Sequence, residues 1–277
     1  MRTVVSILFA GVSIYVLLTA CVYLFQSRLI YFPNVPGRIL TATPGDLGLM
    51  FDGIWITAAD GAKLYGWYVP AGVDSPAVLL CHGNAGNISQ RLDWIELFHK
   101  MGLSVLLFDY RGYGKSSGTP SETGTYLDAE AAWDFLTTRM RLAPNRIVIV
   151  GESLGGPVAA RLARDVRPGA LILVSTFTSV PDLASKFYWY LPVRLLARFR
   201  YPTAEYVTHV SAPVLLIHSL QDEIVSFSHA EEIFGRAQEP KQLLRIIGDH
   251  NSTFSASGPK LREGIRSFLT LHGIPAD

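Results

Sequence analysis

The chain has 277 residues, of which 49% are hydrophobic, and its formal net charge is +1. The mean hydropathy of +0.26 excludes a chain that is disordered throughout, and the balanced charge leaves no basic face large enough to bind nucleic acid. The length fits one large domain that follows a short additional segment. The two cysteines, Cys21 in an apolar stretch and Cys81 at the end of an expected buried strand, are not expected to form a disulfide.

Residues 4–25 contain no charged side chain, which is typical of a helix that crosses a membrane. Such a helix would be roughly 33 Å long, close to the ~30 Å of a bilayer's hydrocarbon core. We interpret residues 1–28 as a single-pass N-terminal membrane anchor. The alternative is a cleaved signal peptide or a lipoprotein modified at Cys21, although the apolar stretch continues past that cysteine. Basic residues balance at the two ends, so the side of the membrane that holds the rest of the chain stays open.

Residues 29–48 are rich in proline, glycine and threonine and predict a linker or extended arm, and residues 49–277 predict a folded domain. In this domain, strand-like segments alternate with helical ones. That alternation is typical of the α/β class, with a mostly parallel sheet covered by helices on both faces. The expected strands are 51–57, 63–69, 77–81, 103–108, 146–150, 170–174, 214–218 and 243–247. The expected helices are 89–100, 122–141, 156–165, 228–237 and 259–271.

Residues 177–210 interrupt the alternation between two expected strands. They combine large apolar side chains such as Trp189 and Leu195 with basic ones such as Arg194 and Arg198. Insertions at the carboxyl ends of sheet strands surround the site in such folds, so we expect a small helical cap. Two readings of its surface remain open: packing on the domain alone, or contact with lipid headgroups as well.

The motif Gly-Glu-Ser-Leu-Gly at 151–155 lies between an expected strand and an expected helix. A serine on such a tight turn presents its Oγ to a substrate carbonyl, and the glycines let the strand and the helix approach closely. The strand–turn–helix context distinguishes a nucleophile elbow from a chance occurrence of the same letters. We therefore expect Ser153 to be a catalytic nucleophile.

A serine hydroxyl needs a base within hydrogen-bond reach, and the base needs an acid that orients it. After an elbow, the acid and then the histidine follow along the chain, each in a loop beyond a strand. His250 follows the last expected strand and is the expected base, and Asp222 follows the preceding strand and is the expected acid. Glu223 is a possible substitute for Asp222, and Asp182 is a weaker rival. The other histidines after Ser153 are expected to be structural.

The oxyanion of a tetrahedral intermediate requires two backbone N–H donors. We expect these from Leu154, at the start of a helix, and from Asn84, in the loop His-Gly-Asn-Ala-Gly-Asn at 82–87. His82 is expected to be structural, because an orienting acid would be missing. The segment Gly-Tyr-Gly-Lys-Ser at 112–116 fails the phosphate-loop pattern, since position 109 is aspartate, and no metal-binding motif occurs. We therefore expect neither a cofactor nor a metal.

Together, several motifs resemble those of the α/β-hydrolase superfamily, and within it the Bem46 and ABHD13/ABHD17-like branch of membrane-associated serine hydrolases. The motifs are H-G-N-A-G-N at 82–87, D-Y-R-G-Y-G-K-S at 109–116, G-E-S-L-G-G at 151–156 and the loops of Asp222 and His250. The resemblance covers about residues 30–272. It implies an eight-stranded, mostly parallel sheet with an antiparallel second strand, and hydrolysis of esters or thioesters.

The chain also departs from the pattern of the family that it resembles in two places. Relatives often have His-Gly where this chain has His218-Ser219, which affects the expected shape of the acid loop. In some relatives the reaction is protein depalmitoylation, but their palmitoylated, cysteine-rich N-termini are missing here, so this role is not carried over.

The sequence therefore predicts a membrane-anchored serine hydrolase that cleaves carboxylic esters or thioesters through an acyl-enzyme. The expected substrate is a small-molecule or lipid-like acyl ester, and the expected partner is a membrane, bound through the N-terminal helix. A peptidase or amidase of the same fold and a non-catalytic membrane scaffold are the alternatives.

Overall fold

A computed structural model of the chain describes residues 1–276; residue 277, the last of the expected domain, lies outside the described residues. At its centre is an eight-stranded sheet with the order β1-β2-β4-β3-β5-β6-β7-β8. Strand β2 is antiparallel to β1 and β4, and the other neighbours are parallel. The strands are β1 (Asp52–Thr57), β2 (Lys63–Val69), β3 (Ala77–Cys81), β4 (Ser104–Phe108), β5 (Ile147–Glu152), β6 (Ala170–Val174), β7 (Val214–Ser219) and β8 (Lys241–Ile246). The expected fold class is confirmed.

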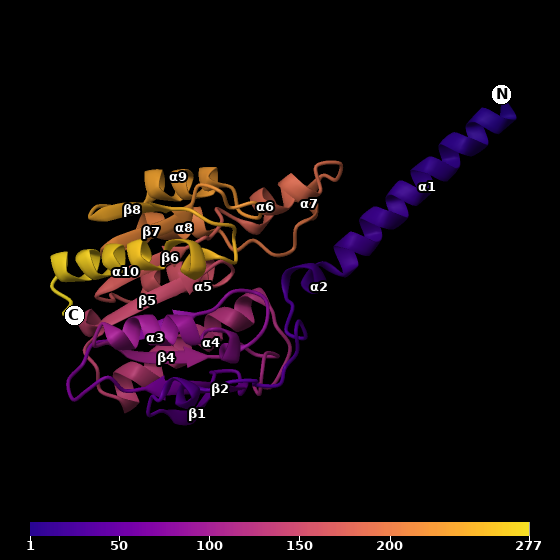
Figure 1. Cartoon of the computed structure of the whole chain (residues 1–277). Coiled ribbons are helices and arrows are strands. Elements are labelled where there is room, and N and C mark those ends of the chain that lie inside the picture. Colours follow the sequence, from indigo (N-terminus) through magenta and orange to yellow (C-terminus); the bar gives the residue numbers. More distant parts are fainter. Residues whose placement is uncertain (277) are drawn as a thin grey trace.

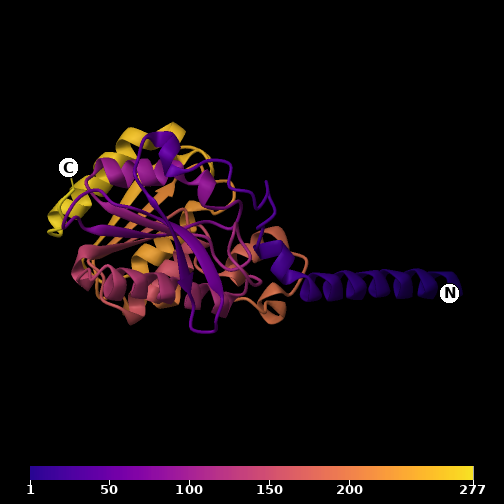
Figure 2. The same cartoon turned by 90° about the horizontal axis from the view of Figure 1, so that it is seen from below.

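Helices cover both faces of the sheet (Figure 1 and Figure 2). α3 and α10 pack on one face, and α4, α5 and α9 pack on the other. Successive side chains of a strand point to opposite faces, so the continuous apolar strands contribute to both layers: Leu79 packs with α5, and Leu80 packs with α3 and α10. The helices of the two layers are α3 (Leu92–Lys100), α4 (Glu122–Asp134), α5 (Gly155–Asp165), α9 (Phe227–Arg236) and α10 (Thr253–Leu271).

Several element boundaries differ from those expected by a few residues, and the helix expected at 122–141 ends as α4 at Asp134 and continues as a π-helical turn to Arg139. β8 begins at Lys241, two residues earlier than expected, because polar side chains are tolerated on this edge strand, which pairs with β7 alone. α10 begins at Thr253 and not at Pro259, and it is kinked at Ser257, where φ is −135°. The kink places Pro259 close to the start of a new helical segment, the one part of a helix that tolerates proline.

The N-terminal segment consists of α1 (Arg2–Leu24), which projects away from the domain, and the short α2 (Gln26–Ile30) (Figure 1 and Figure 2). α1 has a mean hydropathy of 2.3 and is long enough to cross a membrane, although an N-terminal signal sequence has the same properties. Residues 31–48 follow the domain surface. There Arg38 donates to the carbonyl oxygens of Gly114 and Ser116 at 3.0 and 2.7 Å, which holds this segment in place.

The insertion between β6 and β7 contains three short helices, α6 (Val180–Phe187), α7 (Val193–Leu196) and α8 (Thr203–Tyr206). α6 and α7 lie at the end of the domain from which α1 emerges (Figure 1). We refer to residues 177–198 as the cap segment. Its loops carry the aromatic side chains between α6 and α7, and α8 packs on α5 in the body of the domain.

The contact between α5 and β3 supplies a stability prediction. A Cβ added at Gly155 would lie 1.9 Å from the carbonyl oxygen of Cys81, whereas a Cβ at Gly235 in α9 would meet nothing within 4 Å. We expect Gly155→Ala to lower the free energy of unfolding by about 1–3 kcal/mol, as overpacking does. Gly235→Ala is expected to leave it unchanged or to raise it by up to about 1 kcal/mol. Chemical denaturation of the detergent-solubilised chain measures both, and equal stability of the two variants would contradict the prediction.

Candidate active site

Ser153 lies on the turn between β5 and α5, in a strained backbone conformation. Its φ is +50°, in the left-handed region that residues other than glycine seldom adopt. The conformation is held from β6 and the loop after it: the Ser153 N–H donates to the Val174 carbonyl at 2.9 Å, and the Thr176 hydroxyl donates to the Ser153 carbonyl at 2.8 Å. The turn therefore has the geometry of a nucleophile elbow.

The glycines around Ser153 are required by close approach between backbone segments. A Cβ at Gly151 would lie 2.4 Å from the carbonyl oxygen of Gly155, and one at Gly156 would lie 2.0 Å from the Thr176 hydroxyl oxygen. Neither glycine has a positive φ, so space and not backbone conformation requires them. This is the reason expected from the sequence.

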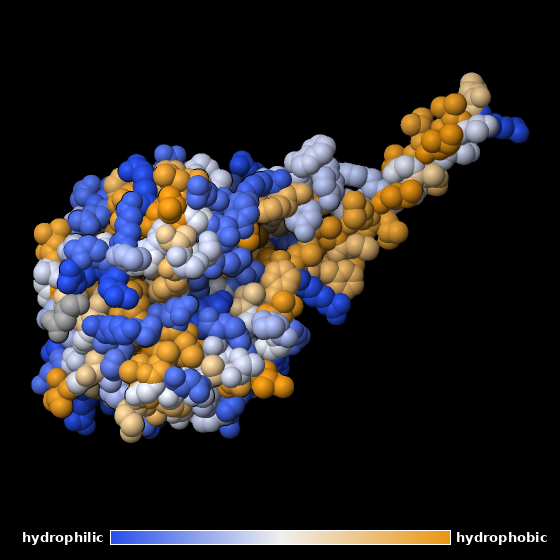
Figure 3. Space-filling view, viewed as in Figure 1, coloured by the Kyte–Doolittle hydropathy of each residue, from blue (hydrophilic) through white to orange (hydrophobic). Residues whose placement is uncertain are grey.

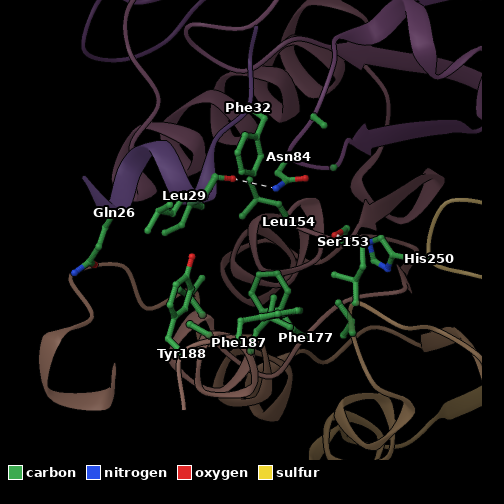
Figure 4. Close-up of a pocket in the computed structure, with 18 of the residues that line it drawn as sticks. Gln26, Leu29, Phe32, Asn84, Ser153, Leu154, Phe177, Phe187, Tyr188 and His250 are labelled. Carbon is green, nitrogen blue, oxygen red and sulfur yellow. Dashed lines mark hydrogen bonds between the residues drawn. The ribbon is translucent and has the colours of Figure 1, made fainter. Parts of the chain in front are cut away.

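The structure brings Ser153, His250 and Asp222 together, from loops beyond three strands. His250 Nε2 lies 3.1 Å from Ser153 Oγ, and His250 Nδ1 lies 2.7 Å from Asp222 Oδ2. Figure 4 shows the serine and the imidazole side by side. Because a carboxylate only accepts hydrogen bonds, Nδ1 carries the proton and Nε2 is free to accept from the serine hydroxyl.

Asp222 is almost fully buried and is kept ionised by its partners. Its Oδ1 accepts from the backbone N–H groups of Ile224 and Val225 at 3.0 and 2.7 Å. Burial alone would raise the pKa of Asp222, but the hydrogen bonds from His250 and Val225 outweigh burial and hold the pKa below its usual value. The side chain of His218 lies close behind, with Nε2 3.5 Å from Asp222 Oδ2.

The rival acids are placed differently. Glu223 Oε2 accepts the backbone N–H of His250 at 3.0 Å, so this side chain holds the backbone of the His250 loop and does not contact the imidazole. Asp182 lies in the first turn of α6, whose N-cap is Ser179, and its carboxylate accepts from the Ser179 hydroxyl at 2.6 Å. The position of Glu223 beside His250 was not expected, since only the folded loops bring the two together.

Asn84 and Leu154, the expected oxyanion donors, line the same cavity as Ser153. Within residues 1–276, neither backbone N–H donates to a protein acceptor. Two other polar groups of Asn84 are in use. Its carbonyl accepts from the Tyr113 hydroxyl at 2.8 Å, and its side-chain amide donates to the Ile30 carbonyl at 3.1 Å, drawn as the dashed line in Figure 4. The loop is thus fixed while its N–H is left for a ligand.

An ion pair that the sequence analysis missed links this loop to the elbow. Arg91 Nε lies 3.0 Å from Oε2 of Glu152, the residue before Ser153. Arg91 Nη2 also donates to the Ala85 carbonyl at 2.9 Å, in the loop of residues 82–87. No local spacing reveals such a pair, because its partners come from separate parts of the chain.

The family model described as "alpha/beta hydrolase fold" matches residues 76–245. The chain belongs to the α/β-hydrolase family. Protein Rv2307c of Mycobacterium tuberculosis is 41% identical over 251 residues, which cover 88% of this chain and 87% of that protein.

Two further relatives confirm the expected branch of the α/β-hydrolases. The α/β-hydrolase domain-containing protein WAV2 of Arabidopsis thaliana is 34% identical, covering 93% of this chain and 92% of that protein. The α/β-hydrolase domain-containing protein 17B of Xenopus tropicalis is 33% identical, covering 70% and 66%. Among solved structures, an esterase of Pyrococcus furiosus shares the fold, with a TM-score of 0.73 and 23% identity, covering 87% of this chain and 97% of that chain.

This α/β-hydrolase has a cavity of about 550 Å³ that begins at Ser153. Figure 4 shows Ser153 and His250 at one end and Gln26, Leu29 and Tyr188 at the other. Most of the side chains that line the cavity are aliphatic or aromatic. The charges of Arg91 and Glu152, which also line it, offset each other in an ion pair. The volume falls in the ~300–1,000 Å³ range of small-molecule sites. Among the described residues, no group of three or more histidine, cysteine or carboxylate side chains is arranged to hold a metal ion.

His82, the first residue of the loop of residues 82–87, and Asp109 form a buried pair. His82 Nδ1 donates to the Gly83 carbonyl at 2.7 Å, and burial lowers the pKa of His82 to about 3. Asp109 Oδ1 accepts the Ile88 N–H at 3.0 Å and lies 3.7 Å from His82 Nε2. Burial raises the pKa of Asp109 to about 7 despite that hydrogen bond. His82 therefore supports the loop as a neutral, structural residue.

The raised pKa of Asp109 predicts a pH dependence of stability. Between the unfolded pKa of 3.8 and the folded pKa of about 7, the folded chain keeps a proton that the unfolded chain releases. The contribution of Asp109 therefore makes the free energy of unfolding fall as the pH rises through this range. Asp109→Asn retains an acceptor for the Ile88 N–H but does not titrate, so the variant should lose this part of the decline. Denaturation at several pH values between 4 and 7.5 measures the difference, and parallel pH profiles would refute the assignment.

Proposed function

We propose that the chain is a serine hydrolase that cleaves carboxylic esters or thioesters. The observation that carries the proposal is the hydrogen-bonded series Ser153–His250–Asp222, with distances of 3.1 and 2.7 Å, at the end of an apolar cavity. Sequence order, position after the strands and geometry agree for all three residues.

In the proposed mechanism, Ser153 Oγ attacks the substrate carbonyl while His250 Nε2 removes the hydroxyl proton. The carbonyl oxygen becomes an oxyanion that accepts from the N–H groups of Asn84 and Leu154. Collapse of this intermediate expels the alcohol or thiol, which takes the proton from His250 and leaves Ser153 acylated. Water, deprotonated by His250, then attacks the acyl carbon; the bond to Ser153 Oγ breaks, the acid leaves, and Ser153 takes the proton back from His250. Asp222 holds the imidazole in the required tautomer throughout and stabilises its charged form.

The cavity wall supports an acyl substrate. Its apolar side chains suit a hydrocarbon chain, and it offers few donors or acceptors for the backbone of a peptide. Similar folds include an esterase from Pyrococcus furiosus and the protein Est1E of Butyrivibrio proteoclasticus, solved with ferulic acid bound. These neighbours favour ester cleavage over amide cleavage for this chain.

We further propose how the chain is divided into a membrane anchor, an arm and a catalytic domain. Residues 1–28 are a membrane anchor, 29–48 are an arm that follows the domain, and 49–277 are the hydrolase domain with a cap insertion at about 177–210. Support comes from the apolar surface of α1, which in Figure 3 continues to its base on the domain. A cleaved signal sequence is excluded if the purified protein keeps residues 1–28, which intact-mass measurement determines.

Fluorophosphonate labelling tests the nucleophile. We expect the full chain in detergent to be labelled. The variant Ser153→Ala should not be labelled, and its ester turnover should fall on the order of 10⁶-fold. Asp222→Asn should lower turnover on the order of 10⁴-fold, because the imidazole then adopts the wrong tautomer. The matched control is Ser211→Ala, at an exposed loop serine, which should be labelled as the wild type is. A folded wild-type chain that is never labelled would support the non-catalytic scaffold.

A substrate panel tests the bond that is cleaved. We expect turnover of p-nitrophenyl esters that increases with acyl length as the apolar cavity fills, and little turnover of the corresponding anilides. Labelling of Ser153 combined with turnover of anilides alone would instead support the amidase. Equal rates from acetate to palmitate would contradict a role of the cavity in binding the acyl group.

A further inference from the structure

The cavity does not end within the hydrolase domain. Its outer wall is formed by Val22 of α1 and by Gln26, Leu29 and Ile30 of α2, facing residues of the cap segment. In Figure 4, Gln26 and Leu29 lie at the end of the pocket opposite Ser153. The site that holds the nucleophile is therefore continuous with the base of the apolar N-terminal helix.

The cap segment is bound to this helix by polar contacts. Gln26 is 8% exposed, and both ends of its side-chain amide are hydrogen-bonded. Its Nε2 donates to the Leu196 carbonyl at 2.7 Å, and its Oε1 accepts the Arg198 N–H at 2.8 Å. The Arg198 guanidinium also lies over the ring of Tyr23, 5.6 Å from its centroid. These contacts join the N-terminal helices to the cap segment across the mouth of the cavity.

A second contact places the cap segment beside the apolar part of α1. The Tyr15 hydroxyl donates to the Tyr190 carbonyl at 3.0 Å. Measured along the helix axis, Tyr15 lies roughly 10 Å from Val22, on the side toward the N-terminus and away from the domain. A backbone carbonyl needs such a donor where water is missing. In the same segment, Trp189 in the loop before α7 and Leu195 in α7 are 81% and 85% exposed, which is unusual for large apolar side chains unless they face lipid or another apolar surface.

We propose that the ester substrate is a membrane lipid with a long acyl chain, and that this chain enters the cavity directly from the bilayer, between α1–α2 and the cap segment. This inference rests on the proposed function. Each methylene favours hydrocarbon over water, so a path that avoids water lets a long chain reach Ser153 without leaving an apolar environment. A dry apolar cavity of about 150 Å³ already holds benzene, and the cavity here is about 550 Å³, which accommodates one such chain. α1 is then a wall of the binding site as well as an anchor.

The test compares two esters in the full chain reconstituted into phosphatidylcholine vesicles. p-Nitrophenyl palmitate partitions into the bilayer, and p-nitrophenyl acetate reaches the site from water. Val22→Trp and Leu29→Trp fill the mouth of the cavity from α1 and α2. We expect each to lower the palmitate-to-acetate ratio of kcat/KM at least tenfold. Because the ratio is taken within one variant, a smaller folded fraction does not change it.

The matched control is Leu8→Trp, which adds the same side chain to α1 at an exposed position away from the cavity. It should leave the ratio within twofold of the wild type. Leu29→Ser adds a hydroxyl to the mouth without filling it and should lower the ratio about threefold. This variant replaces the tryptophan variants in the test if they do not fold. An unchanged ratio in the folded mouth variants, or an equal loss in Leu8→Trp, would overturn bilayer entry. If the folded wild type turned over neither ester, the proposed function itself would be refuted, so the two failures are distinguishable.

Discussion

The close packing of α5 against β3 and β5 is the constraint on which the site depends. Gly151 and Gly155 allow it, and Gly155 comes so near to the Cys81 carbonyl that any side chain there would displace the helix. This packing aims the start of α5 at the cavity, while hydrogen bonds with Val174 and Thr176 hold Ser153 in its left-handed conformation. The same contact sets the distance between the elbow and the loop after β3, which carries the second expected oxyanion donor. One steric requirement thus determines where a nucleophile and two N–H groups meet.

Around this rigid turn, polar side chains position the loops that carry the remaining groups. Two backbone N–H donors orient the Asp222 carboxylate independently of His250, and the imidazole hydrogen-bonds to the carboxylate in this orientation. Glu223 holds the backbone of His250 from the same loop. On the other side of Ser153, the pair Arg91–Glu152 joins the elbow to the loop of residues 82–87. The residues expected to react therefore lie on loops, but each loop is fixed by at least one charged contact.

The sequence predicted the features that depend on local pattern. Continuous apolar segments predicted the strands, and the elbow motif together with chain order predicted which serine, acid and histidine would meet. It did not predict features that depend on contacts across the fold. The pair Arg91–Glu152 and the bonds from Gln26 to the cap segment join residues that no spacing relates. The start of α10 was missed because a proline inside a helical pattern indicates a boundary, and the kink at Ser257 is visible only in three dimensions.

The binding of the cap segment to α2 affects which fragment of this chain represents the whole. The cap helices α6 and α7 are short and depend on partners outside the insertion for their placement. A water-soluble fragment that begins after residue 30 would lack the amide that bonds Leu196 and Arg198, and the hydroxyl that bonds Tyr190. It would also lack one side of the pocket wall. Truncation for crystallisation or screening would therefore yield an intact triad beside an incomplete cavity, and inhibitors selected on it would be fitted to a different shape.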